Sequence, residues 1–456
     1  MKSSLQKLSV PERRQKLSFY LSVLSLCLAA FIASLDASIT NVALPNISAE
    51  LDIAAATAVW IVNSYQLVMV ALILPIAAFA DHIGYKKIFI YGLIIFTLAS
   101  YLCGHADSIN QLLGARAIQG LGAAAILGSN LALVRLTYDP AHLGLGLGIN
   151  AFVIAMGLAG GPVLATLILA IASWQWLFLI NIPIGMLAYL FAMNLPNQKT
   201  KTVKHYNFYS AVLCVLMFSC LIYALGSFTL NVSKSLSLVI LLLGIVCGWQ
   251  LFRRDSCHPA PIFPFDLFNH AIFSLSIFTA CAAFIAQGLA MVALPFLFHQ
   301  AGFSQSQIGW LIAPWACMGA ITAPFAGILT KNVSPALLGL TGLLLLGGGL
   351  LILAFTLNHL SYAFIVMIML CCGLGFGLFL TPNQQMAIAN SPLNKSGAAS
   401  GMLNVARSLG QAIGATGVAL SFSLGYSNYV LWIGVIFAFI AAFLSLMRLE
   451  PFRKKE

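Results

Sequence analysis

Residues 19–45 read FYLSVLSLCLAAFIASLDASITNVALP, and this stretch decides the fold. Its 27 residues are almost all apolar, yet one carboxylate, Asp36, lies well inside the run. Because an α-helix rises about 1.5 Å per residue, about 20 residues cross the roughly 30 Å hydrocarbon core of a bilayer. The stretch is therefore long enough to span a membrane with Asp36 inside it. An ionised aspartate at that depth costs about 2.5 kcal/mol or more, which makes Asp36 a candidate for a functional role.

The composition of the whole chain is that of a membrane protein. Of its 456 residues, 61% are hydrophobic and only 7% are charged, whereas charged residues make up about 25% of a soluble domain. The mean hydropathy is +0.98. A soluble domain is excluded, and an all-α polytopic membrane protein is predicted. The other ten acidic residues fall in loops, at the ends of apolar runs or in the tails: Glu12, Glu50, Asp52, Asp81, Asp107, Asp139, Asp255, Asp266, Glu450 and Glu456.

Apolar runs of spanning length, separated by polar or Gly/Pro breaks, predict fourteen transmembrane helices. They lie at 18–46, 54–80, 86–104, 109–136, 143–171, 175–195, 208–230, 235–252, 269–298, 307–330, 335–357, 361–381, 397–425 and 428–448. An even number of spans places both termini on one side of the membrane, and the basic residues indicate that this side is the cytoplasm. Nineteen Lys and Arg residues then lie inside, Lys234 lies outside, and Arg116 and Arg407 lie within spans. The net charge of +11 thus follows the positive-inside rule and does not indicate nucleic-acid binding.

Weak internal similarity indicates that the core is duplicated. Pro-x-Ala at 75–77 recurs at 324–326, 249 residues later, and an Asn followed by Gly-x-x-x-Gly at 150–161 recurs at 404–414. Spans one to six therefore repeat as nine to fourteen, with spans seven and eight as an inserted pair. The expected domains are an N-terminal six-helix bundle at 1–195, a linker with the inserted pair at 196–268, and a C-terminal six-helix bundle at 269–456.

Several other classes of protein are not expected. The ten cysteines lie mostly within apolar runs and show no CxxC or Cys/His ligand spacing, which predicts neither a disulfide framework nor a metal site. The first apolar run exceeds a signal-peptide core of about 7–15 residues and lacks a convincing cleavage site, so an uncleaved first span is expected. The sequence contains no Ser/His/Asp set, HExxH motif or phosphate-binding glycine loop. An enzyme, a cofactor and ATP hydrolysis are therefore not expected.

Six stretches carry motifs: LDASITNVALP at 35–45, AxxxDHxGYKK at 77–87, RxxQGxG at 116–122, GxxxGPxxAT at 157–166, WQWxFLINxPxG at 174–185 and GAASGxxNxxRxxG at 397–410. Together they resemble the major facilitator superfamily, specifically its fourteen-span drug:proton antiporters of the QacA/EmrB type, over about residues 20–445. The second, fourth and fifth motifs depart from the family pattern, for example at His82 and Gln175, where the family has arginine. The resemblance implies two six-helix bundles with a substrate site near the membrane midplane between them.

Within this family, Asp36 and Arg116 are expected to couple transport to protons. Burial makes a carboxyl group bind a proton more readily, so Asp36 could titrate near neutral pH. The family places helices one and four beside one cavity, but the sequence leaves open whether Asp36 and Arg116 touch. Direct contact would favour the ionised carboxylate, so separation by water or substrate would suit a proton carrier better. The alternatives are a structural Asp36 bonded to Thr40 or an amide, and an Arg116 bonded only to carbonyl groups.

Two further sets of candidates follow. The residues expected to take part in gating, rather than in plain packing or a solvated turn, are Asp81, Gly84, Lys86, Gly157, Gly161 and Pro162. The candidates for lining a substrate cavity, each with packing or lipid contact as the alternative, are Asn41, Trp60, Asn63, Tyr65, Gln66, Gln119, Phe152, Gln287, Trp310, Trp315 and Arg407. Aromatic faces among them suit lipophilic cations, and Arg407 could instead extend to the membrane interface.

The expected function is proton-coupled efflux of drugs or biocides by alternating access, in the inner membrane of a bacterium. Since one carboxylate carries one proton per cycle, lipophilic monovalent cations or neutral compounds are expected in preference to dications, which would move against the membrane potential. The alternatives are a dedicated exporter of a metabolite, siderophore or lipid, and a membrane sensor or scaffold without transport. The expected partners are a small-molecule substrate, protons and lipid, with a monomeric protein and no nucleic acid.

Overall fold

The protein is helical in the computed structural model, which describes residues 10–139, 142–197, 206–227, 233–256, 258, 261–356, 361–392 and 396–449. Within these ranges no β-strand is present. The α-helices are α2 (Val10–Glu50), α3 (Ala55–Ala58), α4 (Trp60–Ile83), α5 (Tyr85–Gly104), α6 (Ile109–Thr137), α7 (Leu143–Leu169), α8 (Trp176–Leu179), α9 (Asn181–Ala192), α10 (Phe208–Ser227), α11 (Lys234–Asp255), α12 (Ala271–Gln300), α13 (Gln305–Leu329), α14 (Pro335–Thr356), α15 (Tyr362–Ala389), α16 (Ser396–Ser423) and α17 (Val430–Met447). The 3-10 helices η1 (Phe265–Asn269) and η4 (Ser427–Tyr429) precede α12 and α17. Most of the predicted loop at 196–207 lies outside the described residues.

Every predicted span coincides with a helix, with α3 and α4 together forming the second span and α8 and α9 the sixth. Among the described residues, eleven helices are long and apolar enough to cross a membrane. The segment 176–192 and most of α10 are apolar but shorter. The remaining helix, α16, carries an asparagine, an arginine and a glutamine along its length. Length and apolarity therefore support eleven spans, fewer than the predicted fourteen.

Two helices extend well beyond the predicted apolar runs. Helix α2 begins at Val10 rather than at residue 18, and α15 continues through Pro382 to Ala389 rather than ending at residue 381. The extension of α15 is held by Asn383, whose Nδ2 donates to the Ser276 carbonyl at 3.2 Å and whose Oδ1 accepts from Arg448 at 2.6 Å. The apolar pattern marks only the part of a helix that lies in hydrocarbon, so it misses such polar extensions.

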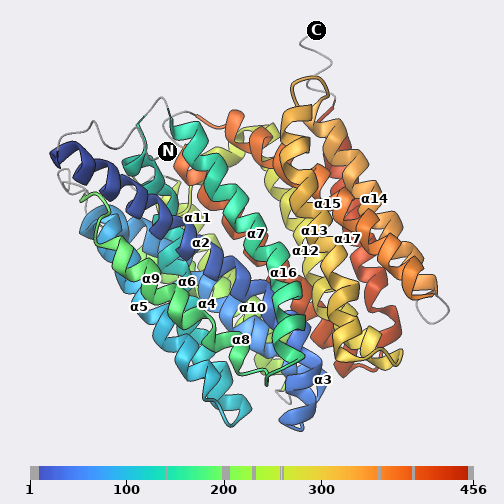
Figure 1. Ribbon diagram of the computed structural model, residues 1–456. Helices are drawn as coiled ribbons and strands as arrows, with labels where there is room; N and C mark the ends of the chain where they lie inside the picture. The colour runs from blue at the N-terminus through green and yellow to red at the C-terminus, as the bar shows by residue number, and fades with distance from the viewer. Residues whose placement is uncertain are drawn as a thin grey trace.

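The helices form two groups that share one packing pattern (Figure 1). In the first group α2 packs against α7 and α9, and α6 packs against α4 and α5. In the second group α12 packs against α16 and α17, and α15 packs against α13 and α14. Helices α10 and α11 pair with each other, and α10 contacts α4 and α16. Helices at corresponding positions of the two groups thus make corresponding contacts.

The matched glycine motifs pack in matching ways in the two groups. A Cβ atom added at Gly157 would lie 2.8 Å from the Phe31 carbonyl oxygen, and one added at Gly161 would lie 2.9 Å from the Ile39 nitrogen, so α7 packs closely on α2. Gly410 and Gly414 let α16 approach α12 in the same way, with distances of 2.6 and 2.5 Å to carbonyl oxygens of α12. Small residues at this spacing permit close contact between membrane helices.

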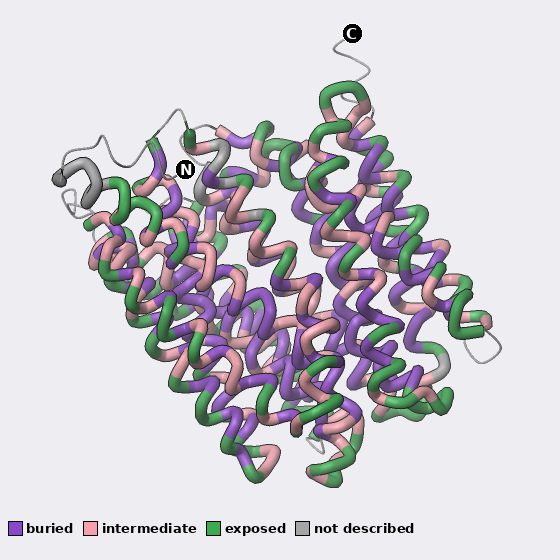
Figure 2. Tube along the Cα trace, in the orientation of Figure 1, coloured by how far each residue is buried: buried purple, intermediate pink, exposed green. Residues whose placement is uncertain are grey.

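Helix α2 begins and α17 ends at the upper side of the bundle in Figure 1, which we call the terminal face. Successive helices alternate in direction, so α4, α6 and α11 end at this face, and α11 begins with Lys234 at the opposite face. Figure 2 shows buried residues where helices face one another and many exposed residues on the outer sides. Large apolar side chains such as Leu98, Phe325 and Phe443 are exposed, as expected of a protein surrounded by lipid.

Candidate functional site

Asp36 lies in the interior of the first group, on the part of α2 that packs against α7. Its side chain is fully buried. The close contacts at Gly157 and Gly161 fall on residues just before and just after Asp36, and Ser38 Oγ donates to the Gly157 carbonyl at 3.3 Å. Close packing of α7 therefore leaves no room for water or larger side chains against α2 on either side of Asp36.

The Asp36 carboxylate is held by one cation and two amides from other helices. Oδ2 accepts from Arg116 Nη1 of α6 at 2.5 Å, and Oδ1 accepts from Gln119 Nε2 of α6 and Asn181 Nδ2 of α9, each at 2.9 Å. The question that the sequence left open is thus answered, because Asp36 and Arg116 are in direct contact. The guanidinium and the two amides all donate to this carboxylate. Thr40 bonds the Asp36 backbone carbonyl, not the carboxylate.

Arg116 is equally well enclosed and is only 1% exposed. Its Nε donates to the Ile61 carbonyl of α4 at 3.1 Å, and Nη1 also donates to Gln119 Oε1 at 2.6 Å. The Tyr65 ring lies below the guanidinium, 4.4 Å from ring centroid to Cζ, in a cation–π contact. The interpretation that Arg116 bonds only carbonyl groups is wrong, since a carboxylate, an amide, a carbonyl and an aromatic ring all contact it.

Two members of this cluster were not assigned a role from the sequence. Asn181 stands in the fifth motif, but the motif gives no indication that its amide reaches α2. Ser100 of α5 accepts from Gln119 Nε2 at 2.9 Å and so links a further helix to the cluster. Both are buried. Four helices, α2, α5, α6 and α9, therefore meet at one polar cluster, which we call the Asp36 cluster (Asp36, Ser100, Arg116, Gln119 and Asn181).

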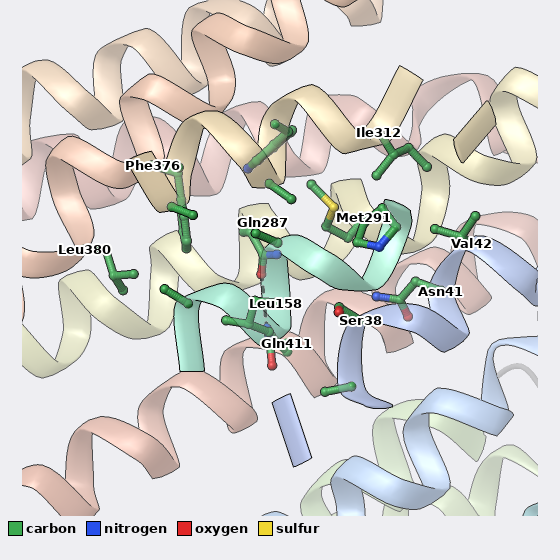
Figure 3. Close-up of a pocket in the computed structure, with 18 residues that line it drawn as sticks. Ser38, Asn41, Val42, Leu158, Gln287, Met291, Ile312, Phe376, Leu380 and Gln411 are labelled. Carbon is green, nitrogen blue, oxygen red and sulfur yellow. Dashed lines mark hydrogen bonds between the residues drawn. The ribbon is translucent and has the colours of Figure 1, made fainter. Parts of the chain in front are cut away.

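A cavity of about 70 Å³ lies between the two groups, beside the turns of α2 that follow Asp36 (Figure 3). Three predicted cavity residues, Asn41, Gln287 and Trp315, line it, as does Pro162. Gln411 Nε2 of α16 donates to Gln287 Oε1 of α12 at 3.2 Å, and Figure 3 draws this bond as a dashed line. Most other lining residues are apolar, namely Ala37, Val42, Ala155, Leu158, Ala159, Met291, Ile312, Ala316, Gly319, Ala320, Phe376 and Leu380.

The remaining cavity candidates lie elsewhere. Asn63 joins the two groups through a 3.2 Å bond from Nδ2 to Thr416 Oγ1, and Gln66 is buried near it on α4. Trp60 packs edge-on against Tyr223 of α10. Phe152 and Trp310 are 53% and 47% exposed and line neither of the two cavities described here, contrary to their prediction. Trp310 is about 140° from Trp315 around the α13 axis, so the two side chains leave the helix on different sides.

A second, larger cavity of about 890 Å³ lies at the terminal face between the two groups. It is lined by residues of α4 and α6, of α16, and of the end of α11 and the segment that follows it, among them Asp81, Arg135, Asp255, Asp266 and Gly401. At the opposite face the groups are joined, because Gln305 Nε2 donates to the Val42 carbonyl at 2.8 Å and Gly309 packs closely on Thr166. The larger of the two gaps between the groups is thus at the terminal face.

Of the predicted gating residues Asp81, Gly84 and Lys86, only Asp81 lines this larger cavity. Asp81 accepts a hydrogen bond from the Tyr85 hydroxyl, and Gly84 adopts φ 107°, which an L-residue with a side chain rarely does. Lys86 Nζ donates to the carbonyls of Met193 and Leu195 at 2.6 and 2.9 Å. Lys86 therefore caps the end of α9, and its contacts stay within the first group.

Asp255 is a buried acid with a structural arrangement that the sequence did not indicate. Its Oδ1 accepts from Ser210 Oγ at 2.6 Å, and its Oδ2 accepts from the backbone N–H groups of Ile262 and Phe263 at 2.9 Å each. The carboxylate thus ties the end of α11 to the start of α10 and to the segment that leads to α12. Within the described ranges, no group of three or more His, Cys, Asp or Glu is placed to hold a metal ion.

Comparison with known proteins agrees with this architecture. A solved structure described as "Crystal structure of a POT family transporter in complex with 5-aminolevulinic acid" superposes with a TM-score of 0.71, at 15% identity, over 94% of this chain and 95% of that one. An inward-facing bacterial homologue of the lysosomal transporter Spinster superposes with a TM-score of 0.64, at 16% identity, over 96% and 98% of the two chains. At these identities the likeness concerns the fold.

Sequence relatives point the same way. The chain is 40% identical to the "Uncharacterized transporter YebQ" of Escherichia coli over 96% of this chain and 97% of that protein. It is 31% identical to the "Multidrug resistance protein Stp" of Mycobacterium tuberculosis over 86% and 74% of the two chains, and 27% identical to the "Methyl viologen resistance protein SmvA" of Salmonella typhimurium over 90% and 83%. These relatives and the fold are those of transporters, not enzymes.

The family description "Major Facilitator Superfamily" matches residues 26–415 and 276–456, which together reach from the Asp36 stretch to the end of the chain. The six motifs, the repeated helix packing and the relatives all agree with this match. The chain is therefore a multi-pass membrane transporter that belongs to the major facilitator superfamily.

Proposed function

We propose that the protein exports lipophilic small molecules in exchange for protons, by alternating access in the cell membrane of a bacterium. The single observation that carries the proposal is the Asp36 cluster. It holds a carboxylate in the interior of the first group, where α2, α5, α6 and α9 meet, and the next residues of α2 line the cavity between the two groups. Two relatives are named for resistance to toxic compounds, which supports export of such compounds.

The cluster offers a direct way to couple a proton to a change of shape. When Asp36 is ionised, Arg116, Gln119 and Asn181 all donate to it, which ties α6 and α9 to α2. A proton on Asp36 would neutralise the carboxylate and weaken its charge-assisted bond to Arg116. Because α2 also packs on α7, which lines the cavity between the groups, the loosened contact changes the wall of that cavity.

The two cavities support the alternating-access part of the proposal. The groups lie apart around the larger cavity at the terminal face and are joined by hydrogen bonds at the opposite face. If the terminal face is cytoplasmic, as the basic residues predict, this is a state that accepts a compound from the cytoplasm. Outward opening would require the contacts of Gln305 and Asn63 across the two groups to break.

The topology follows as part of the same proposal. Fourteen helices cross the membrane, both termini are cytoplasmic, and Lys234 lies outside. The domains are the bundles at 1–195 and 269–456 with the linker at 196–268 between them, and the protein acts as a monomer. Helix α11 begins with Lys234 at one face and carries Arg253 and Arg254 in its last turn at the other face. The larger number of basic residues at the end of α11 supports a cytoplasmic location for that end.

The test is transport into or out of vesicles that contain the purified full-length protein. Vesicles are loaded with rhodamine 123 in one set and fluorescein in another, so that the result does not depend on the charge of the substrate. An imposed pH gradient of one unit supplies about 1.4 kcal/mol per proton. Wild type and Asp107→Asn, which changes an exposed acid at the start of α6, should move at least one dye in response to the gradient, and Asp36→Asn should not. Gradient-driven transport by Asp36→Asn at the wild-type rate would refute the proposal.

A further inference from the structure

Arg407 of α16 is an interior cation that the function proposed above does not use. It is partly buried, and in the described part of the chain it makes no ion pair and no hydrogen bond. It lies on α16, which packs against α4 of the first group, and it lines neither cavity itself, although Gln411 on the next turn lines the smaller one. Arginine in such a place usually has an acceptor, because its guanidinium presents five N–H donors and stays charged.

The interior of the protein carries a surplus of positive charge around this residue. Asp36 and Arg116 neutralise each other through their 2.5 Å contact, and the other acids of the described spans lie at helix ends. Arg407 is therefore left uncompensated, and a proton on Asp36 would add a second positive charge to the same interior. A cationic compound entering between the groups is repelled whether Asp36 is ionised or protonated, whereas a negative or strongly polarised oxygen is attracted in both cases.

The smaller cavity is lined by both amide and apolar side chains, which suits such a compound. Gln411 is one turn from Arg407 on the same side of α16, and it lines the cavity together with Gln287 and Asn41 (Figure 3). The Asn41 side-chain oxygen is buried and has no hydrogen-bond partner, so it can accept a hydrogen bond from an N–H or O–H group of a ligand. Trp315 and Phe376 supply apolar surface in the same cavity. Amides and aromatic rings thus line one cavity, and Gln411 connects it along α16 to Arg407.

We propose that the exported compound is an amphiphile with an apolar ring system and a carboxylate or similarly charged oxygen, and that Arg407 binds this oxygen between the two groups. The inference rests on the proposed export function and names its substrate class. It replaces the expectation of a monovalent cation that the sequence alone gave. Arginine suits the role because its planar guanidinium donates two parallel hydrogen bonds to a carboxylate.

The test is equilibrium binding to the purified full-length protein in detergent, followed by fluorescence polarisation. Fluorescein and rhodamine 123 share a xanthene skeleton and differ in the sign of their charge at neutral pH. Wild type should bind fluorescein at least about tenfold more tightly than rhodamine 123. Arg407→Gln should remove this preference by weakening fluorescein binding, and Arg407→Lys should keep part of it because the charge remains while the planar fork is lost.

The matched control is Arg254→Gln, which lowers the net charge equally at the end of α11, where Arg254 lies against the Tyr209 ring. It should leave the preference unchanged. Tighter binding of rhodamine 123 by wild type, or a fluorescein preference that survives Arg407→Gln, would overturn the proposal. If Arg407→Gln does not purify as a folded protein, the wild-type preference and Arg407→Lys decide the question. Binding needs no proton gradient, so its outcome is independent of whether Asp36→Asn abolishes gradient-driven transport.

Discussion

The buried ion pair makes a specific prediction about stability. Replacing Arg116 with methionine keeps a long, apolar side chain on α6 but removes the donors to Asp36, Gln119 and the Ile61 carbonyl. The carboxylate is fully buried, so water cannot replace the lost partner without rearrangement. Removing one partner of a buried ion pair typically lowers the free energy of unfolding by about 3–5 kcal/mol, and we expect a loss in this range.

The loss should depend on the charge of Asp36. In the double variant Arg116→Met with Asp36→Asn, no buried charge is left unpaired, so the two substitutions together should cost at least about 2 kcal/mol less than the sum of the single ones.

The assay is reversible unfolding of the purified variants in mixed micelles. A matched control is provided by Arg448, which is buried and bonded to Asn383 and Ser445 rather than to an acid. Arg448→Met and Asp36→Asn should be additive within about 0.5 kcal/mol, as expected of sites that share no partner. Additivity of Arg116→Met with Asp36→Asn as well would refute the reasoning, since it would mean that the pair contributes nothing beyond its separate members.

Two further predictions concern packing and capping. Gly161→Ala places a methyl group against Ser38 and 2.9 Å from the Ile39 nitrogen. It should reduce transport about tenfold or more and lower the free energy of unfolding by about 1–3 kcal/mol. Gly160→Ala, whose Cβ meets only a side-chain atom at 4.0 Å, should change neither quantity. Equal loss of vesicle transport in both variants would contradict this. Lys86→Ala removes two hydrogen bonds to the end of α9 and should lower the thermal unfolding midpoint, while the exposed Lys87→Ala should not; equal midpoints for the two variants would show that the cap is unimportant.

The sequence predicted the helices well because the bilayer imposes a length on every apolar run. It missed the ends of α2 and α15, since residues 10–17 and 382–389 are helical without being continuously apolar. The four-residue separation of Gly157 and Gly161, which places both on one side of a helix, indicated that another helix could pack closely there. It did not predict that the partner is the segment of α2 around Asp36, because a motif on one helix does not name the helix that it packs against.

The candidate site was predicted in its charged members but not in its contacts. Asp36 and Arg116 were identified because charges are rare inside a membrane, and rarity is visible in a sequence. Asn181 was overlooked as a partner because amides are common enough to carry no such signal. Trp310 and Trp315 were treated alike, yet only Trp315 lines the cavity. Which side of a helix faces a cavity depends on packing between distant segments, and composition does not contain that information.

The central claim is that Asp36 gives up or takes a proton as the transported compound binds. The most direct test measures proton release from purified wild type and Asp36→Asn in weakly buffered detergent solution when fluorescein or rhodamine 123 is added. The claim predicts a substrate-dependent change of up to one proton per wild-type molecule, and no change for Asp36→Asn, which cannot titrate at this position. Equal proton release from both proteins would contradict the claim and would make Asp36 a structural partner of Arg116 alone.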